Sequence, residues 1–122
     1  MTVLMISIFA VLGALARYFQ STLVANVFGK EFPYATLSIN IIGSFLIGFL
    51  FYLTLERLAT PAYLRAGILT GFLGAYTTFS TFSLETFTLV QEGKVMRAAI
   101  YVLLSVGVGF LAVSAGVALG RR

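Results

Sequence analysis

The chain has no cysteine and no histidine, and charged residues make up only 10% of its 122 positions. Without cysteine it can form no disulfide, and without either residue type it lacks the side chains of the common zinc sites. Hydrophobic residues make up 60% of the chain. A soluble domain of this size would therefore have too few polar side chains to cover its surface. The composition predicts an integral membrane protein, with the lipid bilayer as its surroundings.

The few charges are not arranged as a nucleic-acid-binding surface. The formal net charge is +4, and most charged residues lie near the ends of apolar stretches. No cluster of basic residues is interleaved with exposed polar positions, so we expect no nucleic-acid partner. The length favours a single domain over residues 1–122.

Four apolar stretches are long enough to cross a bilayer, because a helix needs about 20 residues to span a ~30 Å hydrocarbon core. An all-α fold is expected, with transmembrane helices at residues 3–27, 34–55, 63–90 and 95–119. Pro33 and Pro61 each precede a span, where the missing N–H costs least. The first span has an Ala-x-Ala step at Ala14 to Ala16 but no preceding positive charge, so we expect it to be retained and not cleaved as a signal peptide.

Positive charges are divided evenly between the two predicted membrane faces. Loop charge sets the orientation of a membrane protein. One face has Arg57, Arg65, Arg121 and Arg122, and the other has Lys30, Lys94 and Arg97, with Arg17 leaning toward it. Such a chain can insert both ways round and pair with an inverted copy, although a single topology remains open.

Small residues recur along the predicted helices. Ser44 with Gly48 and Ser105 with Gly109 have the small-xxx-small spacing that lets two backbones approach closely. We interpret these residues mainly as helix packing. Because four helices enclose little of a pathway alone, we also expect the chain to oligomerise.

The third span combines glycines with a run of hydroxyl residues in mid-membrane. Gly71 and Gly74 are followed by five hydroxyl residues between Thr77 and Ser83. We predict a break near Gly74 to Thr78, which would leave carbonyls that need another partner, such as a buried cation. The alternative is a continuous helix whose hydroxyls bond back to their own carbonyls.

Phe79 and Phe82 follow this segment three residues apart and share a helical face. Ring edges carry partial positive charge, so edges turned inward could line a path for an anion. Ordinary packing is the alternative. Thr78, Thr81 and Glu85 fall on the stripe of Phe82, which would place a polar track beside the rings.

Several polar residues lie in the other spans. Asn40 could donate to a dehydrated anion or fasten two helices together. Tyr101 and Ser105 are hydroxyl donors one turn apart. Glu85 and Arg17 are ionisable residues within spans, where such residues are functional by default. An ion pair between them is a further alternative.

Three motifs resemble the small fluoride channel family known as Fluc or CrcB. Residues 13–18 resemble its Gly-x-x-x-Arg-Tyr pattern, and residues 35–48 resemble its Thr-Leu-x-x-Asn-x-x-Gly-Ser-Phe-x-x-Gly stretch. Residues 71–85, GFLGAYTTFSTFSLE, resemble its most diagnostic run. The resemblance implies an antiparallel homodimer of dual topology with two fluoride pores in a bacterial inner membrane.

The resemblance also implies roles for single residues. Asn40, Phe79 and Phe82 would line the pores, and the hydroxyls of Ser80 and Thr81 belong to the same motif. Thr36, Glu85, Tyr101 and Ser105 would form a polar track. Carbonyls of Gly74 and Thr77 from both copies would hold a structural sodium ion, and Arg17 would have a structural role. The next hydroxyl of the track is replaced here by Gly109.

We therefore expect a channel that exports fluoride passively, and no enzyme. No Walker-type loop indicates ATP coupling. A proton-coupled exporter of cationic compounds is one rival, although it would need a central carboxylate and aromatic walls. A structural subunit of a larger complex is another, but it would not account for the hydroxyl and phenylalanine run.

Overall fold

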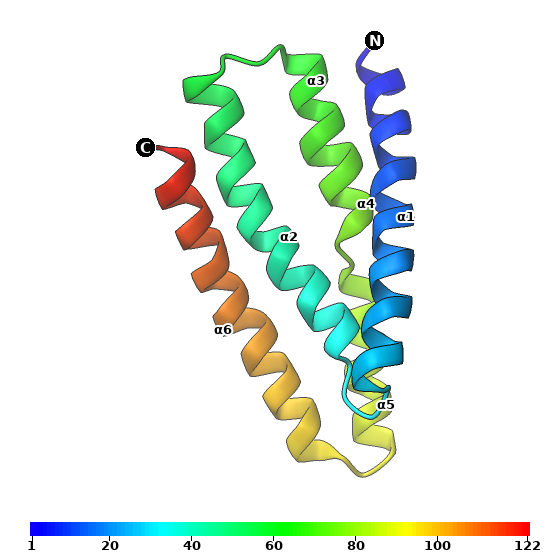
Figure 1. Cartoon of the computed structure of the whole chain (residues 1–122). Helices are drawn as coiled ribbons and strands as arrows, with labels where there is room; N and C mark the ends of the chain where they lie inside the picture. Colours follow the sequence, from blue (N-terminus) through cyan, green and yellow to red (C-terminus); the bar gives the residue numbers. More distant parts are fainter.

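The computed structural model describes all of residues 1–122 and contains only helices and their connections (Figure 1). The first, second and fourth passes are each nearly continuous, and the third is assembled from shorter pieces. The elements are α1 (Thr2–Phe28), α2 (Tyr34–Tyr52), the π-helix η1 (Leu53–Arg57), α3 (Ala62–Ala66), the π-helix η2 (Gly67–Leu73), α4 (Gly74–Tyr76), α5 (Phe79–Gln91) and α6 (Val95–Gly120).

These bounds confirm the four predicted helical passes to within two residues at each end. Three helices are long and apolar enough to cross a membrane: α1, α2 with η1, and α6. The third pass runs from Ala62 to Gln91 through the short pieces. The N-terminus, the loop after η1 and the C-terminus lie toward one end of the bundle, and the other two loops lie at the opposite end (Figure 1). This arrangement agrees with the predicted distribution of loops.

The outer surface of the bundle is apolar, as expected for a protein in lipid. Large hydrophobic side chains such as Val3, Leu103 and Phe110 are more than two-thirds exposed. The buried apolar side chains form two small clusters, one around Ile39, Leu73 and Tyr76 and the other around Leu89, Ala98 and Tyr101. The fold is therefore that of a multi-pass membrane protein.

Glycines permit the closest contacts between the passes. A Cβ on Gly116 of α6 would lie 2.1 Å from the carbonyl oxygen of Phe45 on α2, and one on Gly48 would lie 2.5 Å from that of Val113. These distances are far too short for a real Cβ, so the backbones can meet only at glycine. The predicted packing role is confirmed for Gly48. Gly109 is also buried, but the contact there is less close, since an added Cβ would meet only the Ser44 hydroxyl at 3.7 Å.

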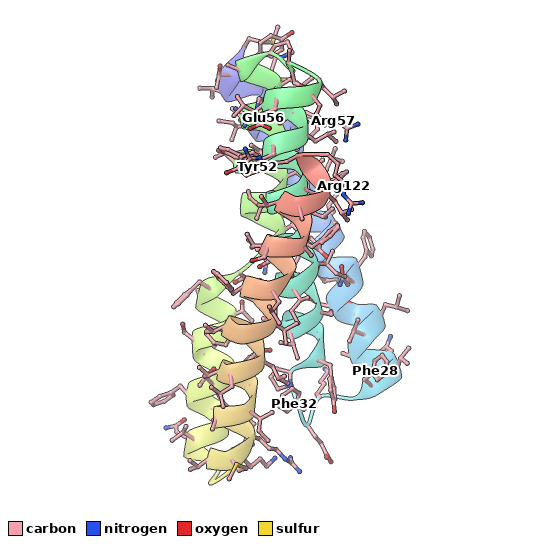
Figure 2. All side chains as sticks on the ribbon, turned by 90° about the vertical axis from the view of Figure 1, so that its left-hand side faces the viewer. Phe28, Phe32, Tyr52, Glu56, Arg57 and Arg122 are labelled. Atoms are coloured by element: carbon pink, nitrogen blue, oxygen red, sulfur yellow. The ribbon has the colours of Figure 1, made fainter.

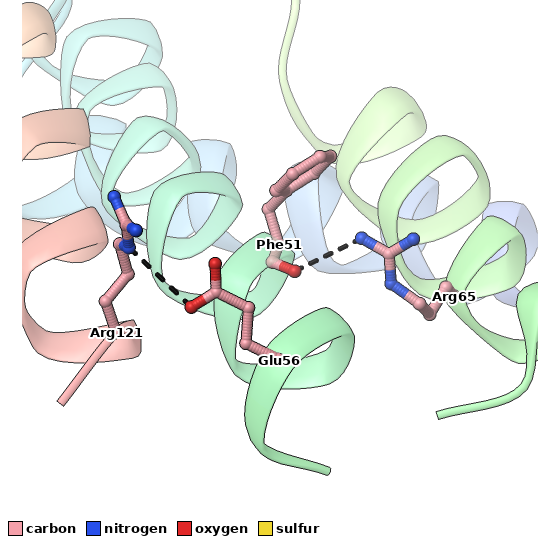
Figure 3. A network of polar contacts seen from close by, with 4 residues as sticks. All are labelled: Phe51, Glu56, Arg65 and Arg121. Atoms are coloured by element: carbon pink, nitrogen blue, oxygen red, sulfur yellow. Dashed lines mark hydrogen bonds and ion pairs between the residues drawn. The ribbon is translucent and has the colours of Figure 1, made fainter. Parts of the chain in front are cut away.

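Arginine side chains join the elements at the end that carries the C-terminus. Arg121 Nε lies 3.6 Å from Glu56 Oε2, and Arg65 Nη2 donates to the Phe51 carbonyl at 3.1 Å (Figure 3). Arg65 Nε also donates to the buried Thr54 hydroxyl at 2.9 Å. In the side view, Glu56 and Arg57 lie at this end, whereas Phe28 and Phe32 lie toward the other (Figure 2). These contacts hold η1 and the end of α2 against α3 and the C-terminal end of α6.

Candidate functional site

The third pass is interrupted at two residues. Helix α4 ends at Tyr76 and α5 begins at Phe79. Between them, Thr77 (φ −84°, ψ 160°) and Thr78 (φ −150°, ψ 121°) are extended. The predicted break is confirmed, and the continuous helix is wrong. Gly74 itself keeps helical angles (φ −62°, ψ −36°), so the interruption begins three residues later than the glycine that suggested it.

Asn40 of α2 holds the interrupted segment in place. Its Nδ2 donates to the Thr78 carbonyl at 3.0 Å, and its Oδ1 accepts from the Thr78 backbone N–H at 3.0 Å. The side-chain amide thus bonds both the N–H and the carbonyl of one extended residue, as a residue of a neighbouring antiparallel strand would. The side chain therefore fastens α2 to the third pass. Because a carboxamide has two N–H donors, one remains for another acceptor.

Two carbonyls at the break lose their helical donors. In a continuous helix the Thr78 N–H would donate to the Gly74 carbonyl, but here it donates to Asn40. The Thr81 N–H, the helical partner of the Thr77 carbonyl, donates to the Thr78 hydroxyl at 3.2 Å as an N-cap bond. The space beside Gly74 is open, since an added Cβ would meet nothing within 4 Å. Carbonyl oxygens of this kind are suitable ligands for a hard cation.

Arg17 and Glu85 do not pair with each other. Arg17 Nε donates to the Ala75 carbonyl at 3.1 Å, next to the break. Glu85 Oε1 instead accepts from the Tyr101 hydroxyl at 2.9 Å. The alternative of an ion pair between them is therefore wrong. The reason is positional, because each side chain has a hydrogen-bond partner on a different helix.

A cavity of about 390 Å³ opens at the break. It brings together four of the nine residues predicted for the pore and the polar track with the two residues predicted for the cation: Asn40, Phe79, Phe82 and Ser105 with Gly74 and Thr77. Its polar and aromatic lining comprises Asn40, Ser44, Gly74, Thr77, Thr78, Phe79, Phe82 and Ser105. The Ser105 Oγ is buried and has no hydrogen-bond partner. Two residues of the lining, Ser105 and Asn40, therefore each have a donor without a protein acceptor.

The two phenylalanine rings lie against each other at the edge of this cavity. Their centroids are 5.8 Å apart at an interplanar angle of 42°, and the Phe82 ring meets Tyr101 edge to face at 5.0 Å. The shared face predicted for Phe79 and Phe82 is confirmed. Phe79 is 68% exposed in the single chain, whereas Phe82 is partly buried. The Phe79 ring is thus available to a second molecule.

Two of the other predicted track residues line a second cavity, of about 600 Å³, near the loop between α1 and α2. Thr36, Thr81 and Glu85 contribute to it. Tyr101 connects the two cavities, since its hydroxyl bonds Glu85 and its ring contacts Phe82. Ser80 lines neither cavity. Its hydroxyl is exposed and lies 3.4 Å from that of Thr78.

Sequence reasoning missed a network on the other side of the break. The Tyr76 hydroxyl donates to Gln20 Oε1, and Gln20 Nε2 donates to the Ser38 hydroxyl at 3.2 Å. These residues join α4, α1 and α2. A glutamine within an apolar span was the only available signal, because a buried amide requires partners. Ser44 was recognised only as a packing residue.

Comparisons with known proteins identify the relatives of this chain. A family model described as CrcB-like protein, Camphor Resistance (CrcB), matches residues 4–117. A protein of Acidithiobacillus ferrooxidans named Fluoride-specific ion channel FluC is 56% identical over 113 residues, 93% of this chain and 88% of the relative. Proteins of the same name from Hahella chejuensis (48% identity, 90% of this chain and 87% of the relative) and Geotalea daltonii (45%, 98% and 97%) are also similar. The chain belongs to the CrcB family.

Proposed function

We propose that this chain forms a fluoride channel, which exports fluoride passively across a bacterial inner membrane and relieves fluoride toxicity. The function follows the name shared by its relatives. The structural observation that carries it is the buried, unpartnered hydroxyl of Ser105 in the cavity at the break. A buried donor without an acceptor is costly, and a dehydrated anion would supply the acceptor.

The lining of this cavity suits a small halide better than a cation. Fluoride is strongly hydrated, so a narrow path must replace its water with hydrogen-bond donors. Ser105 and the remaining N–H of Asn40 are such donors. The edges of Phe79 and Phe82 add partial positive charge without a fixed ion. No carboxylate lines the cavity, which argues against a proton-coupled exporter of cationic compounds.

We propose that the working unit is an antiparallel homodimer with two pores. Phe79 is 68% exposed on the single chain, and Gly74 is open beside it. A second, inverted copy would cover both, and the even division of positive charge between the faces is consistent with insertion in either orientation. Each pore would then be lined by phenylalanine rings from both copies, drawn from Phe79 and Phe82.

The carbonyls of Gly74 and Thr77 would hold a structural sodium ion between the copies. Each lacks its helical donor, and carbonyl oxygens suit hard cations. Gly74 and Thr77 of one chain supply two oxygens, so the same pair from a second copy would be needed to surround the ion. In this account, Arg17 secures the neighbouring Ala75 carbonyl and keeps the break in register.

Growth of a fluoride-sensitive bacterial strain tests the export function. The strain should lack its own fluoride exporter and express either this chain or its Phe82→Ile variant. We expect the chain to restore growth in fluoride and to lower the intracellular fluoride concentration, and the variant to do neither. Unchanged intracellular fluoride in cells whose membranes contain the chain would refute the proposal. Resistance to cationic dyes in its place would favour the exporter.

A further inference from the structure

We propose that the hydroxyl of Ser44 on α2 is a further fluoride-binding donor of the pore, next to Ser105 and at the level of Gly109 on α6. The inference rests on the proposed channel function and adds a site residue that the sequence motifs had suggested only for helix packing. It is carried by three observations: the lining of the cavity, the bonding of its hydroxyls and the space at Gly109.

Ser44 shares the cavity at the break with the donors already described. The lining includes Ser44 and Asn40 from α2 and Ser105 from α6, with Phe82 from α5. Asn40 and Ser44 are four residues apart and lie on the same side of α2. A halide held by Asn40 and Ser105 would therefore find the next hydroxyl of α2 one turn further along.

The Ser44 hydroxyl is free to donate. A serine or threonine within a helix usually donates to the carbonyl three or four residues before it, as Ser38 does to Ala35 and Ser114 does to Phe110. In the cavity, Thr77 donates to the Leu73 carbonyl at 2.9 Å. The Thr78 hydroxyl accepts from the Thr81 N–H and lies 3.4 Å from the Ser80 hydroxyl.

Ser44 has no such bond, and neither has Ser105, whose oxygen is buried. These two serines are thus the cavity hydroxyls without a protein partner. Their O–H groups can both be directed at an acceptor in the cavity, which an anion would provide.

The Ser44 hydroxyl lies beside Gly109, the position on α6 that continues the row of Tyr101 and Ser105. Tyr101, Ser105 and Gly109 are spaced by four residues, so they lie along one face of α6, with about 6 Å of rise between successive positions. A Cβ built on Gly109 would lie 3.7 Å from Ser44 Oγ and near nothing else. The Ser44 hydroxyl therefore lies beside the position where α6 would present its next side chain.

The geometry gives a compensation experiment. Fluoride efflux is measured from liposomes that contain the full chain, with assembly checked by size-exclusion chromatography in detergent. We expect Ser44→Ala to lower fluoride efflux at least threefold while the protein assembles as before. Adding Gly109→Ser should restore most of the efflux, because the Cβ that carries the new hydroxyl would lie 3.7 Å from the position of the lost Ser44 Oγ.

The matched control is Gly109→Ala in the Ser44→Ala background. It fills the same space without a hydroxyl, so we expect it to restore nothing. If Ser44→Ala conducts like the unaltered chain, Ser44 is not a donor of the pore. If Gly109→Ser and Gly109→Ala restore efflux equally, or neither restores it, the role of Ser44 is packing. Either result overturns the proposal.

Two further arms keep the test decisive. If Ser44→Ala does not assemble, Ser44→Thr and Ser44→Val are compared, since their side chains have similar shapes and differ in the hydroxyl. The Ser44→Thr variant should conduct better than Ser44→Val, and equal efflux would overturn the proposal.

If the unaltered chain carries no fluoride, the proposed function fails. If it conducts and Ser44→Ala conducts equally, only the role of Ser44 fails.

Discussion

Asn40 bonds both the N–H and the carbonyl of Thr78, each at 3.0 Å. This pair replaces the helical bonds that the third pass loses, and it ties the break to α2. The cavity, the free carbonyls and the positions of both phenylalanines all depend on it. Asn40 is therefore as important for the shape of the pore as for any contact with an ion.

Replacing Asn40 by Asp should disrupt the break. An ionised aspartate cannot donate to the Thr78 carbonyl, and leaving a buried partner unsatisfied costs about 1–3 kcal/mol. We expect a lower thermal unfolding temperature in detergent and no measurable fluoride efflux. The other asparagine of the chain, Asn26, is exposed, so Asn26→Asp is the matched control for stability and should have the unfolding temperature of the unaltered protein. An Asn40→Asp variant with normal stability and efflux would be inconsistent with this role.

Phe79→Ile and Phe82→Ile should each cut fluoride efflux sharply, on the order of tenfold or more, because an aliphatic side chain has no positively polarised edge. Assembly should persist, since the volume change is modest. Efflux from liposomes is the measurement. Phe28→Ile is a suitable control, because Phe28 is exposed at the end of α1 (Figure 2) and lines neither cavity. Normal efflux in both pore variants would count against the aromatic lining.

Sodium should stabilise the assembled protein. A ligand that binds only the folded state raises stability in proportion to the logarithm of its concentration above its Kd. We expect the unfolding temperature to rise when sodium replaces N-methylglucamine at constant ionic strength, and to rise less with potassium. Equal unfolding temperatures in sodium, potassium and N-methylglucamine would show that the Gly74 and Thr77 carbonyls hold no ion.

Gly116→Ala should destabilise the packing of α2 against α6, since the new Cβ would lie 2.1 Å from the Phe45 carbonyl oxygen. A Cβ on Gly107 of the same helix would meet nothing within 4 Å. Gly107→Ala should therefore leave the unfolding temperature unchanged or raise it, because alanine favours a helix by up to about 1 kcal/mol over glycine. Equal effects of the two substitutions would contradict the described contact between α2 and α6.

Orientation can be tested with accessible tags on both termini. The even division of positive charge predicts that neither orientation dominates, so membrane-impermeant labelling of intact cells should reach about half of the molecules. Adding two lysines to the loop after η1 should shift that fraction strongly. A single orientation in the unaltered chain would exclude an antiparallel pair.

The passes could be predicted from hydropathy because a long apolar helix is stable in the bilayer whichever helices it packs against. The break could be predicted only approximately. Gly74 and the hydroxyl run indicated the region, but the interruption falls at Thr77 and Thr78 because Asn40, 38 residues away, takes over the Thr78 peptide. A bond between distant residues leaves no local pattern in the sequence.

The same limit applies to the side chains of the site. Ser105 could be found from its place one turn after Tyr101. Ser44 looked like a packing residue, because its spacing to Gly48 has that meaning in most membrane helices. Its free hydroxyl and its position beside Gly109 of α6 depend on the arrangement of two helices, which the spacing within α2 does not indicate. The network of Gln20, Ser38 and Tyr76 was missed for the same reason, since it joins three helices.

The most direct test of the central claim is electrogenic halide efflux from liposomes that contain the purified chain. Vesicles loaded with potassium fluoride or potassium chloride are opened to potassium with valinomycin, and external halide is recorded with ion-selective electrodes. We predict rapid fluoride efflux that requires valinomycin, is unaffected by an imposed pH gradient and is absent for chloride. Fluoride efflux no faster than from protein-free vesicles, or equal efflux of both halides, would contradict the account.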